Sequence, residues 1–467
     1  MTLIIINLIF YSILAAFRPK IPILLLIFAL PSYLIRFSII GIPLTLLESM
    51  ILISFFFFIV TKGPNVLKGI KNKLKNKKKY PFRFEIIAIL IISYLAVAIS
   101  SFSLPSLGIW KAYFFEPIIL FILILNYFQL KNDWKKIIWS LTLSALFVSI
   151  IAIFQKITGA YIFNSFWANE VNRRVVSIFG YPNAIGLYLA PIILLSVGLL
   201  NNYLQNIKKL KNKLLSLSLI FIIILSILSV YFAHSEGGLI AIFSAILIYL
   251  FIYNFKTRLI SGFLIIITVL SLFLIPSAHD YAQEKFLLQD KSGQIRISQW
   301  KETWEMLKEN KTWIFGAGLN NYQNKITPHH KDGIFIKDYN DPDWLRKTLY
   351  NKEFRQSTWQ PLEIYLYPHN IILNFWVELG LLGVIAFMFL FIKIYIKAFK
   401  YLNNNYWRPL SASVIGAISA IVIHGTIDVP YFKNDLSAMF WVIIALLSLM
   451  IIHNKKNGKT TNNQDNS

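Results

Sequence analysis

Three short stretches of the chain combine residues that can hold an anion and move a proton. The first is a pair of arginines, Arg173 and Arg174, which precedes a Gly-Tyr-Pro-Asn turn. The second places Arg296 four residues before Trp300, ahead of a Gly-Ala-Gly break. The third is Pro368-His369-Asn370, directly before an apolar segment. Because arginine pairs with phosphate oxygens through two parallel N–H bonds and neutral histidine can accept a proton, these stretches predict an anion site with a candidate general base.

Each of these residues also has an ordinary structural explanation. An arginine at a membrane interface can extend its side chain to neutralise lipid phosphates. Function is favoured for Arg296, whereas Arg174 and its neighbour Arg173 stay open as alternatives for one role. His369 follows a proline at a helix start, where unsatisfied N–H groups and the helix dipole favour an anion and a neutral imidazole. A capping histidine at the interface is the alternative.

The composition determines which elements must position these residues. Hydrophobic residues make up 56% of the 467 residues, charged residues only 15%, and the mean hydropathy is +0.59. A chain this apolar needs lipid as the solvent for most of its surface. Apolar segments of about 20 residues recur from end to end, as helical spans require, whereas a barrel would show short alternating segments. The fold class is therefore predicted to be an all-α polytopic membrane protein.

Hydrophobic runs between charged breaks predict about thirteen transmembrane helices, with twelve equally supported. They fall near 3–16, 21–35, 43–61, 84–101, 108–128, 136–156, 183–200, 215–233, 237–254, 259–276, 371–392, 409–427 and 436–452. The first two are short and form either a pair of spans or a less regular structure. This pattern divides the chain into an N-terminal bundle of about ten spans, a large loop, C-terminal helices and a disordered polar tail. Their boundaries are 1–276, 277–370, 371–453 and 454–467.

Charge predicts the orientation. The net charge is +24, and lysine and arginine gather between the spans, mainly in 62–83, 208–213, 256–258 and 393–400. This is the pattern of cytoplasmic loops, and without an aromatic-basic motif it argues against nucleic acid as a partner. The segments 157–182, 234–238 and 277–368 then face outward, in a multi-pass protein of the cell inner membrane. The chain has no cysteine, so neither a disulfide nor a thiolate metal site is available.

The large loop has internal order. Ile297, Trp300, Trp304 and Leu307 recur at helical spacing and predict an amphipathic helix that lies on the bundle or the membrane interface. The polar stretch 328–361 has the turn chemistry of a mobile lid. It includes His329 and His330, which have no acidic or cysteine neighbours at metal-ligand spacing and are interpreted as loop surface.

In order, these motifs resemble the O-antigen ligase and O-antigen polymerase superfamily. The resemblance rests on an arginine before Phe-x-x-Pro-Asn, an Arg-x-x-x-Trp helix, a Gly-x-Gly break, and His-Asn opening a helix with Glu-x-Gly-x-x-Gly. His424 with Asp428 and Trp441 extend it, so that it covers about 174–441. One departure is the turn 235–238, Ser-Glu-Gly-Gly, where members of the family often carry Ser-Arg.

The resemblance implies a metal-independent, inverting glycosyltransferase with a GT-C-like fold and no cofactor. It implies a polyprenyl diphosphate-linked glycan as donor and a hydroxyl on a glycan, lipid or protein as acceptor, at the extracytoplasmic face of the bilayer. Arg174, Arg296 and Arg173 are then the candidates for binding the diphosphate, and His369 is the candidate catalytic residue. Asn370 and Glu378 are candidate supporting residues, although helix–helix hydrogen bonding explains Glu378 equally well.

A transporter or flippase of lipid-linked glycans is the competing class. Such a protein is expected to show repeated halves and ionisable residues near the midplane, whereas the polar candidates here gather at one membrane face. This asymmetry favours an enzyme. Polymerase and ligase differ only in the acceptor, and the sequence does not separate them.

Overall fold

A computed structural model describes residues 2–39, 41–74, 80–205, 207–309 and 311–462. The fold is helical, with two small antiparallel hairpins, β1 with β2 and β3 with β4. The N-terminal half contains α1 (Thr2–Phe17), α2 (Lys20–Phe28), η1 (Leu30–Leu34), β1 (Arg36–Ile39), β2 (Ile42–Thr45), α3 (Leu46–Leu74), α4 (Arg83–Ile99), α5 (Leu104–Trp110), η2 (Lys111–Phe115), α6 (Glu116–Tyr127), α7 (Asp133–Thr158), α8 (Ser165–Ala168), α9 (Asn183–Leu204) and α10 (Leu210–Phe232). The rest contains α11 (Glu236–Tyr253), α12 (Phe255–Leu274), α13 (Pro276–Phe286), α14 (Lys291–Lys308), α15 (Thr312–Phe315), α16 (Tyr322–Ile326), η3 (Thr327–His329), β3 (Gly333–Phe335), α17 (Trp344–Tyr350), α18 (Lys352–Thr358), β4 (Trp359–Pro361), α19 (Ile371–Phe399), α20 (Arg408–His424) and α21 (Asn434–Asn462).

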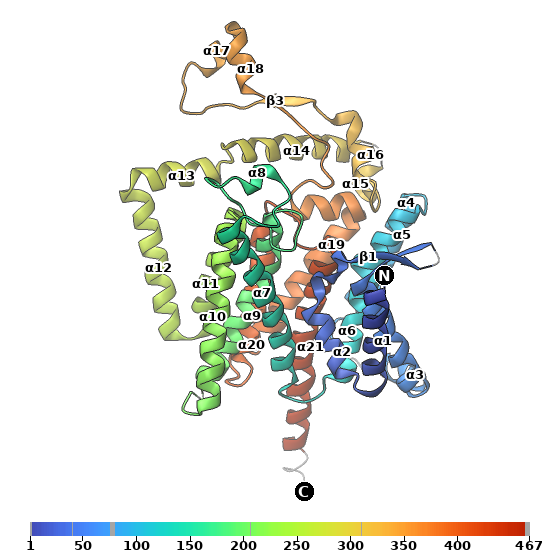
Figure 1. Ribbon diagram of the computed structural model, residues 1–467. Helices are drawn as coiled ribbons and strands as arrows, with labels where there is room; N and C mark the ends of the chain where they lie inside the picture. Colours follow the sequence, from blue (N-terminus) through green and yellow to red (C-terminus); the bar gives the residue numbers. More distant parts are fainter. Residues whose placement is uncertain (1, 40, 75–79, 206, 310, 463–467) are drawn as a thin grey trace.

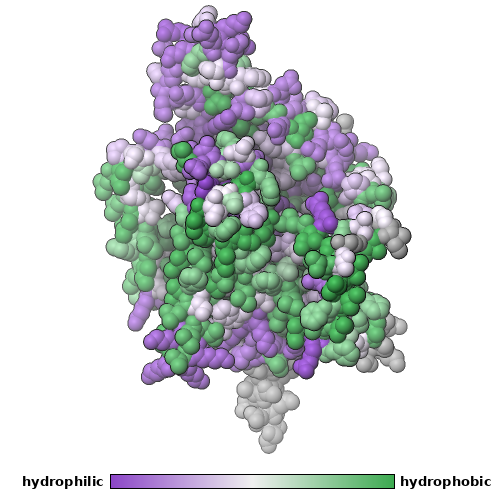
Figure 2. Space-filling view, in the orientation of Figure 1, coloured by the Kyte–Doolittle hydropathy of each residue, from purple (hydrophilic) through white to green (hydrophobic). Residues whose placement is uncertain are grey.

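The protein is a multi-pass membrane protein by the length and composition of its helices. Within the described residues, eight helical segments are long and apolar enough to cross a bilayer, and α1 and α20 are shorter apolar helices. The eight are 104–127, 133–158, 183–204, 210–232, 236–253, 255–274, 371–399 and 434–454. Figure 2 shows the result as an apolar band across the face in view, with hydrophilic surface above and below it. The all-α polytopic class is confirmed, with fewer qualifying helices than the twelve or thirteen predicted.

The structure decides one open alternative and differs from one prediction. The apolar run 21–35 is the less regular structure and not a span, because it divides into the nine-residue helix α2 and the short 3-10 helix η1, which a proline opens. At the other end, α21 continues to Asn462, whereas 454–467 is predicted to be a disordered tail. Residues 463–467, and the lysines at 75 and 77–79 in the predicted cytoplasmic loop, lie outside the described residues.

The two ends of the bundle carry different structures. At one end lie the short connections between α9 and α10, α11 and α12, and α19 and α20 (Figure 1). At the other end, α13 and α14 lie across the helices, and an arm formed by β3, α17, α18 and β4 rises above them (Figure 1). The long loop is therefore a structured layer on the end of the bundle that is opposite to the short, basic connections.

The predicted amphipathic helix is present as α14, but its buried face is different from the predicted one. Leu307 is buried as predicted, whereas Trp304 is 37% exposed. The remaining buried side chains are Gln299, Glu302, Thr303 and Met306. Polar residues can be buried here because the loop supplies hydrogen-bond partners: Gln299 donates to Tyr367 O, and Thr303 bonds to the Tyr322 hydroxyl.

A kink in α19 receives the loop. Gly380 has φ 72° and ψ −177°, which interrupts the helical backbone. Its partner is Gly316, also at positive φ, where an added methyl group would lie 2.4 Å from Val377 O and 2.8 Å from Gly380 N. Only glycine tolerates this backbone-to-backbone contact at positive φ. The Gly-x-Gly break and the Glu-x-Gly motif therefore fit together, which fixes the loop to α19.

Candidate active site

A cavity of about 330 Å³ lies where α14 crosses the ends of α9, α11 and α20. Its cationic lining residues are Arg174, Lys285 and Arg296. Its acidic lining residues are Glu236, Asp290 and Asp428. The other lining residues are Asn183, His234, Ser235, Gly237, Ser292, His424 and Ile427. We call this space the reaction cavity.

Arg174 reaches the reaction cavity from the loop between α7 and α9. The loop is held by buried Gln155, whose side-chain oxygen accepts hydrogen bonds from the backbone N–H groups of Val176 and Ser177. The Arg174 guanidinium donates to the carbonyl oxygens of Ala233 and His234, at the carboxyl end of α10. Burial lowers the pKa of Arg174, and Glu236 opposes that shift; the guanidinium stays charged. Arg174 therefore fastens the turn after α10 and also presents positive charge to the cavity.

Arg173 points to a different place. Its guanidinium donates to Lys156 O at 2.9 Å, lies 3.8 Å from Glu170 and packs over Gly159 at the end of α7. The lining of the reaction cavity, within the described residues, includes Arg174 and not Arg173. Of the two adjacent arginines, the structure thus brings Arg174 to the other candidates.

The Ser235-Glu236-Gly237-Gly238 turn forms one wall of the reaction cavity. It comes close to α9, since a methyl group at Gly186 would lie 2.5 Å from Ser235 Oγ and 3.1 Å from Gly238 Cα. Burial lowers the pKa of His234 in this turn, and the positive charges of Arg174 and Lys156 lower it further. His234 is therefore neutral at neutral pH.

Helices α13 and α14 bring two further cations. Lys285 pairs with Glu236 at 2.8 Å and with Asp290 at 3.0 Å. Burial alone would lower the pKa of Lys285, but hydrogen bonds to these two carboxylates raise it above its ordinary value, so the ammonium persists. Arg296 donates to Ser292 through one terminal nitrogen, and its buried Nε has no hydrogen-bond partner among the described residues. A buried donor without a partner marks Arg296 as the cation most open to a ligand.

His369 lies beside the reaction cavity and forms a pair with Asp428. Its Nδ1 is 3.6 Å from Asp428 Oδ1, and the Asp428 side chain is only 2% exposed. Burial would raise the pKa of Asp428, but His369, His424 and the Val429 N–H lower it below its ordinary value. The carboxylate is therefore ionised and attracts the imidazole, although 3.6 Å exceeds hydrogen-bond distance and the buried His369 Nδ1 has no hydrogen-bond partner among the described residues.

Helix α14 also sets the position of His369. Gln299 donates to Tyr367 O at 2.7 Å, and Trp300 donates to Pro368 O at 2.8 Å. His369 itself has φ 45°, a conformation that is uncommon outside glycine. The Arg-x-x-x-Trp spacing therefore has a structural reason, because one helix carries Arg296 and holds the backbone before His369.

Asn370 and Glu378 support this arrangement without reaching the cavity lining. The Asn370 side chain caps α19 by accepting from the N–H groups of Ile372 and Leu373, and it donates to Thr426 O near the end of α20. Glu378 is buried and accepts from Asn320 N at 2.8 Å, beyond the Gly-x-Gly break. Asn370 thus holds the segment that contains His369 next to the segment that contains Asp428. Glu378 attaches the loop after the Gly-x-Gly break to α19.

His424 was part of the resemblance but not among the candidate site residues. It is 3% exposed and lines the reaction cavity. Its Nδ1, Ser235 Oγ and Arg296 Nε are buried without hydrogen-bond partners in the described part of the chain. Unpaired polar atoms around one cavity indicate a space built for a polar ligand or ordered water.

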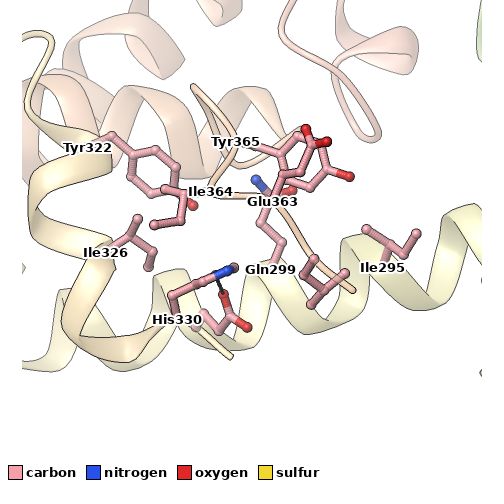
Figure 3. A pocket seen from close by; sticks show the side chains of 10 residues that line it. Ile295, Gln299, Tyr322, Ile326, His330, Glu363, Ile364 and Tyr365 are labelled. Carbon is pink, nitrogen blue, oxygen red and sulfur yellow. Dashed lines mark hydrogen bonds and ion pairs between the residues drawn. The ribbon is translucent and has the colours of Figure 1, made fainter. Parts of the chain in front are cut away.

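A second histidine–carboxylate pair joins the segment after η3 to α14, and Figure 3 shows His330 beside this helix. His330 Nδ1 is 3.3 Å from Glu302 Oε2, and Glu302 also accepts from Lys331 N. The adjacent pocket has a volume of about 10 Å³, room for about one water molecule. His329 pairs with Glu309 at 3.3 Å, and the two histidine side chains are only 13% and 14% exposed. The interpretation of both as loop surface is therefore wrong: they attach the arm to α14.

Besides His424, four charged cavity residues were missed as site candidates. Glu236, Lys285 and Asp290 form an ion-pair chain across α11, α13 and α14, and Asp428 pairs with a histidine far away in the sequence. For Glu236, Lys285 and Asp290 the only signal in the sequence was position, since they lie in segments predicted to face outward; Asp428, at the end of a span, was also part of the resemblance.

Residues 221–388 match the family model Wzy_C, described as O-Antigen ligase. The match begins within α10 and ends within α19, so it includes Glu236, Lys285, Arg296 and His369. Curated proteins gave no match. The family match confirms the resemblance to the O-antigen ligase superfamily that the motifs predict.

Proposed function

With residues 221–388 similar to O-antigen ligases, we propose that the protein transfers a glycan from a polyprenyl diphosphate-linked donor to an acceptor hydroxyl at the extracytoplasmic face of the inner membrane. The observation that carries the proposal is the convergence of Arg174 and Arg296 on one cavity, beside the His369–Asp428 pair. The cavity is lined by residues of α13, α14 and the adjoining ends of the bundle helices, where a lipid-anchored diphosphate would meet fixed positive charge.

The residues support a single displacement. His369, oriented by Asp428, takes the proton from the acceptor hydroxyl while the oxygen of that hydroxyl forms a bond to the anomeric carbon of the donor. The bond from that carbon to the phosphate oxygen breaks, and its electron pair leaves with the polyprenyl diphosphate. Arg296, with Arg174 and Lys285, neutralises the charge on the leaving group. One displacement inverts the anomeric configuration.

Lys285 contributes less to leaving-group stabilisation than Arg296 in this scheme. Its ammonium is already paired with Glu236 and Asp290, so it adds positive potential with fewer free donors than Arg296. Fixed cations of this kind can stabilise a diphosphate leaving group without a divalent metal ion. We therefore expect transfer to continue at an unchanged rate in the presence of EDTA; loss of activity that magnesium restores would contradict this part of the scheme.

Incubation of the purified protein with a polyprenyl diphosphate-linked glycan tests the proposal. Longer lipid-linked chains would identify a polymerase, and glycan on a different lipid, protein or wall polymer would identify a ligase. The control is a proteoliposome assay for movement of the donor between leaflets. Leaflet movement with no new glycosidic bond would contradict transfer and identify a flippase.

The face of the membrane is tested separately. Ser357 and Asn340 lie on exposed parts of the arm, and the chain has no cysteine of its own. Cysteines introduced at these positions should react with a membrane-impermeant maleimide in intact cells. Protection of both until the cells are lysed would place the arm and the reaction cavity in the cytoplasm.

A further inference from the structure

A second, larger cavity lies outside the reaction cavity. Its volume is about 730 Å³, and it lies between α13, the start of α14 and the arm. Asp290 lines both this outer cavity and the reaction cavity. The two spaces are therefore adjacent, so that one extended ligand could occupy both.

Aromatic side chains from separate segments line the outer cavity. Tyr281 comes from α13, Tyr339 from the strand-to-helix connection of the arm, Trp344 from α17 and Phe354 from α18. Tyr281 and Tyr339 are 54% and 47% exposed, so much of their surface is available to a ligand. Pyranose rings present apolar C–H faces bordered by hydroxyl groups, and flat aromatic side chains beside polar groups match that surface.

Charge limits the class of ligand. Acidic lining residues outnumber basic ones: Asp280, Glu284, Asp290, Asp338 and Asp341 against Lys291 and Lys337, although Asp290 and Asp341 are paired with Lys285 and Lys347 outside the lining. Carboxylates accept hydrogen bonds from sugar hydroxyl groups and attract amino groups, whereas they repel carboxylated, sulfated or phosphorylated chains. The outer cavity therefore suits a neutral glycan, or one with amino groups, and the reaction cavity with its arginines suits the diphosphate.

The arm is held in place by hydrogen bonds of its own. The Gln294 side chain on α14 both donates to Lys337 O and accepts from Lys337 N, each at 2.8 Å. Within the arm, Ile336 N donates to Thr358 O, and the Trp344 indole donates to Ile336 O. The aromatic side chains are thus positioned before a ligand arrives, which reduces the entropy cost of binding.

We propose that the outer cavity binds the glycan portion of a substrate, several sugars away from the bond that reacts, and prefers neutral or amino-bearing oligosaccharides. This inference rests on the proposed function for the placement of the reacting bond in the reaction cavity. The glycan can belong to the donor or to a growing acceptor, which present the same chemistry to the aromatic side chains.

Calorimetric titration with a lipid-free oligosaccharide tests the proposal. The probe is the surface polysaccharide of the producing cell, cut to about six to ten sugars. The wild type should bind it, and Tyr339→Ala/Phe354→Ala should bind about tenfold more weakly, as expected when central aromatic contacts are lost. Tyr350→Ala is the matched control, because Tyr350 is an 85% exposed aromatic residue on the same arm outside this lining. Tyr339→Ala alone keeps the test valid if the double variant does not fold.

Two further measurements separate this proposal from the proposed function. His369→Ala should bind the oligosaccharide as the wild type does, while its transfer rate falls by roughly 10² to 10⁴. In active protein, the arm variants should raise KM about tenfold for the donor or for the acceptor, which identifies the source of the glycan, and leave kcat unchanged. Equal oligosaccharide binding by the wild type and the arm variants, or preferred binding of a polyanionic heparin fragment, would overturn the outer-cavity proposal even if transfer occurs. Binding that depends on the arm, without transfer, would support the cavity and overturn the proposed function.

Discussion

Two histidine–carboxylate pairs lie next to α14, and in both a histidine Nδ1 lies within 4 Å of a buried carboxylate. His369 is 3.6 Å from Asp428, and His330 is 3.3 Å from Glu302. In both pairs the carboxylate is almost completely buried, with side-chain exposures of 2% and 4%. The pair geometry alone therefore does not distinguish a catalytic site from a structural contact.

The surroundings distinguish them. The His369 pair borders a cavity of about 330 Å³ that contains three cations and unpaired polar atoms. The His330 pair closes a pocket of about 10 Å³, where Glu302 is also bonded to Lys331 N. Space for a substrate, and charge to hold it, are the reasons for which we propose a functional role for the first pair, whereas the second pair joins the segment before the arm to α14.

Removal of the two histidines should give opposite results. We expect His369→Ala to reduce the transfer rate by roughly 10² to 10⁴, the usual contribution of a general base, with normal expression. His330→Ala, the matched control, should transfer at nearly the wild-type rate. Transfer rates and donor binding, measured in the same detergent, check this. Full activity of His369→Ala with normal donor binding would remove His369 from the site.

Arg296→Lys should have the next largest effect. It keeps the charge but loses the planar pair of donors, at a cost of about 1.5 to 3 kcal/mol, or roughly tenfold to a hundredfold in donor affinity or rate. Arg173→Lys is the control, since Arg173 bonds to Lys156 O outside the cavity lining. If Arg296→Lys binds and turns over the donor normally, Arg296 belongs to the lipid interface instead.

Asp428→Asn should reduce the rate about tenfold, because the imidazole remains but loses its orienting charge. The lowered pKa of Asp428 keeps this carboxylate negative at working pH, where it favours a protonated neighbouring histidine. Without that charge the protonated form of the imidazole base is less stable and forms only at lower pH. The acid limb of the pH–rate profile should therefore move to lower pH. A shift to higher pH would contradict the pairing. Asp428 stabilises the fold at neutral pH, and that contribution is lost only as pH falls below about 4.

The smallest effect on activity is expected at the structural pair. His330→Ala should destabilise the attachment of the arm by about 0.5 to 1.5 kcal/mol, since Glu302 loses one hydrogen-bond partner and keeps Lys331 N. Limited proteolysis of the arm should become faster while the transfer rate stays within about twofold. A large loss of transfer with an intact arm would show that the two pairs do not differ in function.

Hydropathy predicted the sequence positions of most spans, but it did not predict which spans lie in the centre of the bundle and which lie at its periphery. Helices α12 and α21 have similar hydropathies of 2.2 and 2.3. Yet 6% of the most apolar stretch of α12 is buried, against 89% for α21. Lipid and protein interior are both apolar solvents, so composition does not separate a peripheral span from a central one.

The candidate site was predictable where local sequence carried the signal. Arg174, Arg296 and His369 stand out through neighbouring turns and helix starts, and the structure places all three at or beside one cavity. Lys285 and Glu236 have no such local signal, because their pairing depends on how α11 and α13 meet. The sequence likewise could not decide between Arg173 and Arg174, because the path of the loop after α7 determines which side chain reaches the cavity.

The anomeric configuration of the product tests the account most directly. The purified protein is given a polyprenyl diphosphate donor of known configuration and an acceptor, and the new linkage is assigned by NMR. Single displacement, with His369 as base and the arginines on the leaving diphosphate, predicts a glycosidic bond of inverted configuration, whose formation His369→Ala slows by roughly 10² to 10⁴. A product of retained configuration would contradict this mechanism.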